Sequence, residues 1–262
     1  MTTTKPVARP APALRAVAAL TAMELRLTAR RGENVLVTLI IPVAVLLFFG
    51  GTSVGGALGG TRESIVAGSI ALAIIAAGFV NLGIATAYER SYGVLKRLAG
   101  APLPRWGLVA AKVTALILIE LVQVVLLTAV AALAFGWAPG SDWSPILAFG
   151  AVVLGTTTFA SLGLLLAGTL RAEATLAIAN GLFLAFLMLG GIVVPIDRLP
   201  AAIRPISSVL PSTALADLLR IALDGGSLAA PGGAVGSPVP AVATLLAWAG
   251  IALLGTRFAR WD

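Results

Sequence analysis

One carboxylate stands in the middle of a long apolar stretch of the chain. Glu120 lies within residues 108–136, which are otherwise almost entirely apolar, and Gln123 follows it three residues later. This spacing places both side chains on nearly the same face of a helix. An ionisable group inside a membrane-spanning helix is costly and by default suggests a function, here on a substrate path or in a proton-sensitive element. The alternative is a hydrogen-bonded glutamate that fastens neighbouring helices together.

Two asparagines are further polar candidates within apolar stretches. Asn81 and Asn180, like Glu120 and Gln123, are predicted to lie on a substrate path or to hydrogen-bond between helices. The chain has no histidine and no cysteine, which removes the usual general base and the thiolate chemistry of enzymes and metal sites. No group of Asp and Glu residues has the spacing of metal ligands. We therefore expect no metal site and no cofactor in this chain.

The chain also lacks the common phosphate-binding loop, so it cannot hydrolyse ATP by that route. The pattern G-x-x-x-x-G-K-[ST] is absent, and the only lysines are Lys5, Lys96 and Lys112. The sequence therefore predicts that the chain is not an enzyme in its own right.

The composition predicts an all-α integral membrane protein. Hydrophobic residues make up 59% of the chain and charged residues only 11%, whereas a soluble domain carries roughly 25% charged residues. Several apolar runs reach or approach the ~20 residues that a helix needs to cross a bilayer. We predict one domain over 1–262, with a flexible tail at 1–12 and a bundle of six spans over 34–256. The spans are expected at about 34–51, 65–87, 108–136, 145–169, 174–194 and 240–256.

Residues 13–31 are helical in composition but not uniformly apolar. At about 100° per residue, Arg15, Arg26 and Arg30 cluster on one face. A different face holds Leu14, Val17, Ala18, Thr21 and Leu25. We expect an amphipathic helix in the membrane interface, with Glu24, Arg26 and Arg30 among its polar residues and membrane lipid as a partner. The alternative is a cytosolic helix packed on the body of the protein.

The distribution of basic residues predicts the orientation. With both termini in the cytoplasm, fourteen of the 18 Lys and Arg residues fall in cytoplasmic segments. This bias favours an even number of spans. The formal charge of +7 thus reflects membrane topology, and no nucleic acid partner is expected.

Charge gathers in the connector between the second and third predicted spans. Residues 88–99 are expected to form a cytosolic helix of about three turns with a small apolar patch, and Gly100 and Pro102 stop it. A loop that only fixes topology needs the charges but not the patch, so we interpret the segment as a docking element. Between spans five and six, residues 195–239 form an external segment. Its first part, 195–223, contains four interrupting prolines and is predicted to hold short or re-entrant helices.

Three segments resemble one family. Residues 88–106 read Y-E-R-S-Y-G-V-L-K-R-L-A-G-A-P-L-P-R-W and are followed by Lys112; residues 24–31 read E-L-R-L-T-A-R-R and precede an apolar run containing Pro42. Residues 190–213 read G-G-I-V-V-P-I-D-R-L-P-A-A-I-R-P-I-S-S-V-L-P-S-T. In this order they resemble the permease subunits of type-2 ABC exporters. The connector departs from the usual pattern at Ser91, where a second acidic residue is common, and at Val94, where threonine is usual.

The resemblance implies a six-span permease with an interfacial helix and a coupling helix that engages a separate ATP-binding subunit. That subunit would hold ATP and Mg²⁺, and two permeases, identical or paralogous, would pair in a bacterial inner or plasma membrane. The implied ATPase-coupling residues are Glu89, Arg90, Gly93, Leu95, Lys96, Arg97 and Leu98. The implied outer gate comprises Pro195, Leu199, Pro200, Pro205 and Pro211.

The function that we expect is ATP-driven export of a hydrophobic or amphipathic molecule, drug-like or lipid-like. Aromatic residues, which commonly guide sugar polymers, are only 6% of the chain. Two alternatives remain open at this stage. One is a carrier driven by an ion gradient, and the other is a membrane subunit on the same scaffold that moves no cargo.

Overall fold

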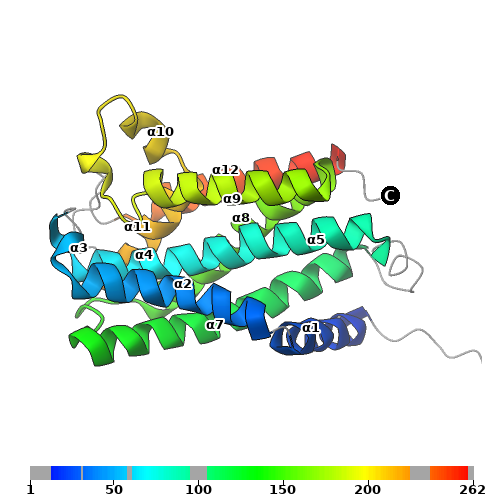
Figure 1. The fold of residues 1–262 in the computed structure, drawn as a ribbon, viewed down its shortest axis with the longest axis horizontal. Coiled ribbons are helices and arrows are strands. Elements are labelled where there is room, and N and C mark those ends of the chain that lie inside the picture. The colour runs from blue at the N-terminus through cyan, green and yellow to red at the C-terminus, as the bar shows by residue number, and fades with distance from the viewer. Residues whose placement is uncertain (1–12, 31, 58–60, 95–104, 225–236, 259–262) are drawn as a thin grey trace, which may run out of the picture.

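The computed structural model describes residues 13–30, 32–57, 61–94, 105–224 and 237–258, and every regular element among them is helical. The long helices form an elongated bundle (Figure 1). They are α1 (Ala13–Arg30), α2 (Gly32–Gly51), α4 (Arg62–Ile75), α5 (Leu82–Ser91), α7 (Arg105–Phe135), α8 (Pro145–Thr169), α9 (Ala172–Leu189), α11 (Pro211–Asp224) and α12 (Val239–Gly255). Shorter helical turns are α3 (Ser53–Ala57), η1 (Ala76–Asn81), η2 (Ile196–Arg198), α10 (Arg204–Ser208) and η3 (Thr256–Phe258).

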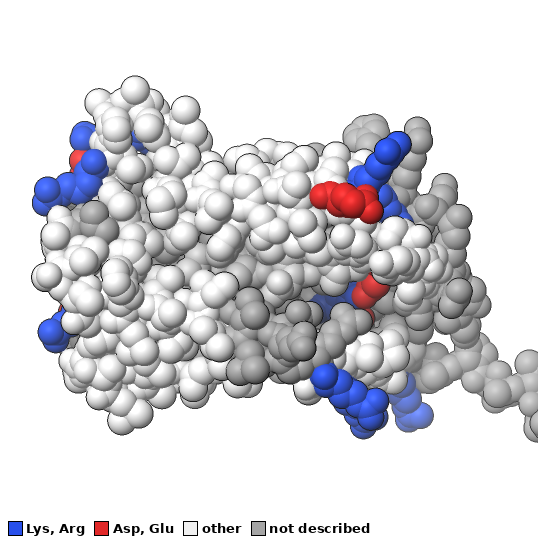
Figure 2. Space-filling view, in the orientation of Figure 1, with Lys and Arg blue, Asp and Glu red and all other residues white. Residues whose placement is uncertain are grey.

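Four helical stretches of the described chain are long and apolar enough to cross a bilayer. These are Arg62–Ser91, Trp106–Phe135, Pro145–Thr169 and Ala172–Leu189; Leu39–Gly51 and Val239–Gly255 are apolar but shorter. In Figure 2 the charged side chains gather at the two ends of the bundle, and the band between them carries none on the face shown. The length, composition and charge distribution are those of a membrane protein.

The stretch Arg62–Ser91 is the most buried of the four. It is continuous through α4, η1 and α5, and η1 is a π-helical turn of six residues in its middle. Around this turn the rings of Phe79, Phe159 and Phe186 meet edge to face, with centroids 5.6 to 6.5 Å apart. The contact joins η1 to α8 and α9, so three spans share one aromatic core.

Two glycines let α8 approach this central stretch closely. A Cβ added at Gly83 would lie 3.1 Å from the Cα of Gly163, and one at Gly163 would lie 2.8 Å from the carbonyl oxygen of Phe79. Small residues at such crossings allow membrane helices to pack backbone against backbone.

Several predicted boundaries need correction. The second span was expected over 65–87, but the helix continues to Ser91. The fifth was expected over 174–194, but α9 ends at Leu189 because Gly191 adopts a positive φ of 65° and turns the chain. A single helix over 88–99 is wrong as well, since α5 ends at Ser91 and Gly93 has a φ of 69°.

The two ends of the bundle differ in structure. α3, α10 and α11 lie at one end, which we call the α11 end. α1, the last turn of α5 and η3 lie at the other, which we call the α1 end (Figure 1). α11 packs between α4, α8 and α12, and the indole nitrogen of Trp248 in α12 donates a hydrogen bond to the carbonyl of Val209 at 2.9 Å. The α11 end is thus fixed to the spans beneath it.

Candidate functional site

A buried lysine joins three helices at the α1 end. Lys112, in the second turn of α7, places its Nζ 2.9 Å from Oε1 of Glu24 in α1 and 3.0 Å from the carboxylate oxygens of Glu89 in α5. The lysine side chain is 6% exposed, and the two carboxylates are 20% and 26% exposed. We call these three residues the Lys112 bridge. One cation therefore holds the N-terminal helix and the end of the central span against α7.

The next residue along α5 extends this network to the turn between α8 and α9. Arg90 donates from Nη2 to the carbonyl oxygen of Leu170, which caps the C-terminal end of α8 two residues before α9 begins at Ala172. Because Leu170 ends α8, its carbonyl has no helical partner further along that helix. Neighbouring residues Glu89 and Arg90 thus bind different parts of the bundle.

The other predicted coupling residues divide into two groups. Gly93 lies in the turn after α5, where its positive φ suits glycine. Tyr92 beside it stacks on Tyr88 and is 71% exposed. Leu95, Lys96, Arg97 and Leu98 lie outside the described residues. A contact of Glu89, Arg90 and Gly93 with an ATPase stays a prediction.

α1 is a helix, as expected, but its predicted apolar face is partly turned to protein. Thr21 is buried and contacts the carbonyl of Ala111 in α7 at 3.4 Å, while Leu14 is 79% exposed. Glu24 faces α7 in the Lys112 bridge, and Arg26 and Arg30 are exposed. The helix therefore combines packing on the body of the protein with an exposed basic face.

Glu120 lies inside the bundle. Its side chain is 1% exposed, and its Oε2 is hydrogen-bonded to the hydroxyl of Thr156 in α8. That hydroxyl also lies 2.7 Å from the carbonyl of Val152. Since one hydroxyl carries one hydrogen, both contacts are satisfied together when the glutamate is a protonated acid. Gln123, on the same side of α7, is also buried. The geometry is that of a bond between helices.

The two asparagines are placed differently from Glu120. Asn81 ends the π-helical turn η1 and is exposed, although it lies in the middle of the central stretch. Asn180 is exposed on α9, and its side-chain amide donates to the carbonyl of Leu176 at 2.8 Å. η1 and α9 pack against each other. Two neighbouring spans thus carry a polar group at a surface that is otherwise apolar.

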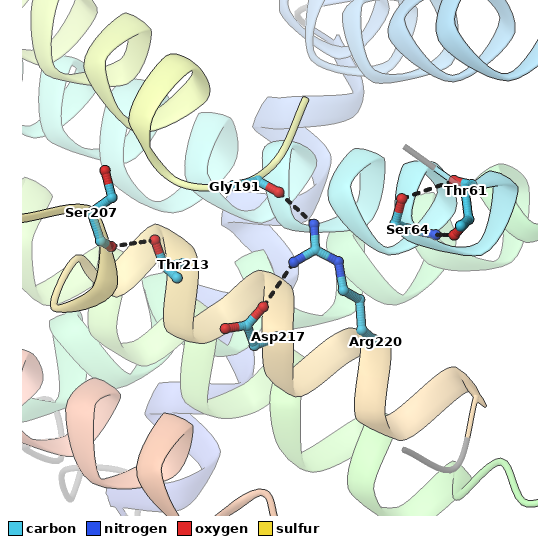
Figure 3. Close-up of polar contacts among 7 residues, drawn as sticks. All are labelled: Thr61, Ser64, Gly191, Ser207, Thr213, Asp217 and Arg220. Carbon is cyan, nitrogen blue, oxygen red and sulfur yellow. Dashed lines mark hydrogen bonds and ion pairs between the residues drawn. The ribbon is translucent and has the colours of Figure 1, made fainter. Parts of the chain in front are cut away.

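At the α11 end a buried arginine holds two elements together (Figure 3). Arg220 is 4% exposed; its Nη1 lies 2.8 Å from Oδ1 of Asp217, and its Nη2 donates to the carbonyl oxygen of Gly191. The arginine thereby fixes the turn after α9 against α11. The spacing of three residues between Asp217 and Arg220 allows an ion pair to be predicted from the sequence. The contact of Arg220 with the carbonyl of Gly191 has no such signal in the sequence.

Two carboxyl groups of α11 have raised pKa values. Burial raises the pKa of Asp217, although Arg220 opposes the shift. Burial and the nearby charge of Glu63 in α4 raise the pKa of Asp224 from 3.8 to about 6, again against the effect of Arg220. The loop before α8 closes over this point, since Gly140 and Ser144 donate backbone hydrogen bonds of 2.9 and 2.8 Å to the carbonyls of Leu223 and Ala222.

The predicted gate residues lie around these contacts. Pro195 is buried and precedes η2, Leu199 follows η2, and Pro200 is exposed in the next turn. Pro205 is exposed at the start of α10, and Pro211 is buried at the start of α11. The prolines divide the segment into short elements because proline suits the first turn of a helix but not its interior. Whether these elements open and close stays a prediction.

No group of three or more acidic side chains that could hold a metal ion occurs among the residues that the structure describes.

Comparison with known proteins agrees with this architecture. A search of curated proteins found no match to this chain. The family profile described as ABC-2 type transporter matches residues 15–223, from the first turn of α1 to the end of α11. The chain therefore belongs to the ABC-2 type transporter family and is a membrane permease domain of that family.

Proposed function

We propose that this permease works with a separate ATP-binding subunit and exports a hydrophobic or amphipathic molecule. The observation that carries the proposal is the ABC-2 match, which extends over both the Lys112 bridge and the α11 end. The ATP-binding subunit supplies ATP and Mg²⁺, and it docks at the α1 end, on the segment that follows α5. Both termini lie on that side, in the cytoplasm of a bacterial cell.

The contacts at the α1 end support a mechanical role for the segment after α5. Glu89 binds Lys112 of α7, and Arg90 binds the carbonyl that ends α8. A displacement of this segment by a docked ATPase therefore acts on α7, α8 and the N-terminal helix at once. The spans carry the movement to the α11 end, where Arg220 connects α11 to the turn after α9. ATP binding would shift the population between a closed and an open outer gate.

The exposed asparagines support pairing of two permeases. An exposed amide at a lipid-facing surface is a polar group of the kind that commonly lies at contacts between membrane helices. Asn81 and Asn180 are exposed on spans that pack together, so a second copy or a paralogue against this region would cover both. The substrate path would then run along the same surface, which also presents Leu176 and Leu184, four residues on either side of Asn180 in α9. Such a lining suits hydrophobic cargo.

The test is reconstitution in lipid with the ATP-binding subunit that co-purifies with the chain. We expect ATP turnover stimulated by the transported molecule, and accumulation of that molecule on the side opposite the ATPase. Variants Glu89→Gln and Arg90→Gln should weaken stimulation. Arg62→Gln is the matched control, because Arg62 is exposed at the start of α4, outside the predicted coupling and gate residues. Complex formation without stimulation across candidate cargoes would favour a subunit that moves nothing.

The same preparation distinguishes an ATP-driven exporter from a carrier driven by an ion gradient. That function requires transport without the ATPase and loss of transport in Glu120→Gln. The bond between Glu120 and Thr156 supports a structural role instead, because an amide can replace a protonated acid in it. Transport that persists without ATP and collapses with the ion gradient would refute the proposed ATP-driven mechanism.

A further inference from the structure

The N-terminal helix α1 presents different chemistry on its different faces. Its inner face meets α7 through Thr21 and Glu24, and the latter is 2.9 Å from Lys112. Glu24 is the only acidic residue of α1. Because this carboxylate points inward and pairs with a lysine, it neutralises nothing on the outer side of the helix.

The outer face carries a row of three arginines. Arg15, Arg26 and Arg30 are all exposed. At about 100° per residue they fall within an arc of about 60°. No acidic side chain of α1 lies in this arc, since Glu24 is on the opposite side. We call these three residues the arginine row.

Exposed apolar side chains lie next to the arginine row on the same helix. Met23 is 41% exposed and Leu27 is 40% exposed. On the helical projection they lie about 20° and 60° beyond Arg30. A basic stripe beside an exposed apolar stripe is the pattern of a helix lying at the boundary between head groups and acyl chains.

The position of α1 agrees with this pattern. In Figure 1 the helix lies along the flank of the bundle, under α7, and not over the tip where α5 ends. At the same place in Figure 2, basic side chains project downward from the lower edge of the molecule, away from the long axis of the bundle. They lie at the level where the uncharged band ends. A bilayer that covers this band therefore brings its head groups to the arginine row.

We propose that the arginine row is a binding site for anionic phospholipid head groups in the leaflet at the α1 end. The phosphate of such a lipid pairs with the guanidinium groups, and its acyl chains lie against Met23 and Leu27. Guanidinium groups bind phosphate oxygens in a bidentate manner, which favours arginine at such a site. The proposal concerns the permease alone and does not depend on the ATPase or on the cargo.

The experiment uses the full chain in uncharged detergent micelles. The chain has no cysteine, so Ala22→Cys, on the exposed side of α1, gives a single attachment site for an environment-sensitive fluorophore. The labelled protein is titrated with phosphatidylglycerol, with phosphatidylcholine, and with glycerol 3-phosphate. We expect a saturable response to phosphatidylglycerol that weakens with added salt, and little response to the other two.

The decisive variant is Arg26→Gln combined with Arg30→Gln. Each arginine near an anionic surface strengthens binding about fivefold, so the pair should lower the apparent affinity for phosphatidylglycerol roughly 25-fold. The matched control is Arg171→Gln combined with Arg257→Gln, which removes two exposed arginines outside α1. This control should bind as the parent protein does. Unchanged thermal unfolding would show that both double variants remain folded.

Three results would overturn the proposal. One is an equal response to phosphatidylcholine, and a second is an equal response to glycerol 3-phosphate, which has the anionic group but no acyl chains. The third is a double variant that binds phosphatidylglycerol normally. If the same variant no longer forms a complex with the ATP-binding subunit, that result would assign the arginine row to a protein contact.

Discussion

Replacing Lys112 by methionine keeps most of the buried stem and removes the cation that Glu24 and Glu89 share. In the parent protein, Nζ lies 2.9 Å from one carboxylate and 3.0 Å from the other. The variant leaves two carboxylates close together with no positive charge between them. Breaking a buried ion pair on one side costs about 3–5 kcal/mol. Because these carboxylates retain 20% and 26% exposure, we expect the lower end, about 3 kcal/mol.

The measurement is the thermal midpoint of the purified permease in micelles. For a chain of this size, about 3 kcal/mol corresponds to a fall of roughly 6–12 °C. The triple variant, with Glu24→Gln and Glu89→Gln added, should recover most of this loss because no uncompensated charge remains. Each glutamine variant alone should cost less, since Lys112 keeps one partner. Arg198→Met is the control; it breaks an exposed pair at 4.0 Å and should cost at most about 1 kcal/mol.

The comparison of Lys112→Met with the triple variant shows whether the loss of stability comes from the uncompensated carboxylates. If the triple variant is no more stable than Lys112→Met, the cost comes from the lysine stem or from the local backbone, and our account of the Lys112 bridge is wrong. A second readout separates stability from coupling. With the ATPase bound, the triple variant should hydrolyse ATP at a near-normal basal rate but respond weakly to cargo, because the end of α5 is no longer joined to α7 and α1 through Lys112.

Three further predictions concern other parts of the chain. Glu120→Gln should retain stability, because the amide can still bond to Thr156. Glu120→Leu should lower the free energy of unfolding by about 1 kcal/mol, because the bond between α7 and α8 is lost while Thr156 keeps its contact with Val152. Thermal unfolding compares the two variants. Arg220→Met should free the turn after α9 from α11, and limited proteolysis should then cut faster at the α11 end. The pKa of Asp224, raised to about 6, means that the folded protein keeps a proton that the unfolded chain releases near pH 4. Stability should therefore fall as pH rises from about 4 to about 6, and Asp224→Asn should flatten this dependence in melts across that range.

The positions of most helices follow from the sequence because apolar runs, prolines and glycines set their limits. α8 occupies 145–169, as its run predicts, since Pro145 begins it after the capping hydroxyl of Ser144. The error in the fifth span has a clear cause. The run continues to 194 in hydrophobicity, but Gly191 turns the chain with a positive φ, and hydropathy does not report backbone conformation.

The sequence shows which polar residues belong to the candidate site, but it does not show which of them contact one another. The polar residues could be found because charges and amides are rare in this chain. Glu24 and Glu89 are separated by 65 positions and meet only because α1 folds back on α7. The sequence placed Glu24 on an interfacial helix and Glu89 on a docking surface. No periodicity within either helix shows that both carboxylates share one lysine.

The break after α5 changes how the coupling segment is expected to act. A continuous helix over 88–99 would carry Glu89, Arg90 and the later residues as one rigid element. In the structure, Glu89 and Arg90 belong to the last turn of the central span, and Gly93 separates them from the residues beyond it. The first part is fixed by the Lys112 bridge and by Leu170, whereas Tyr92 is exposed. A partner would therefore bind the chain beyond the turn, and Glu89 and Arg90 would transmit the movement of that segment to the bundle.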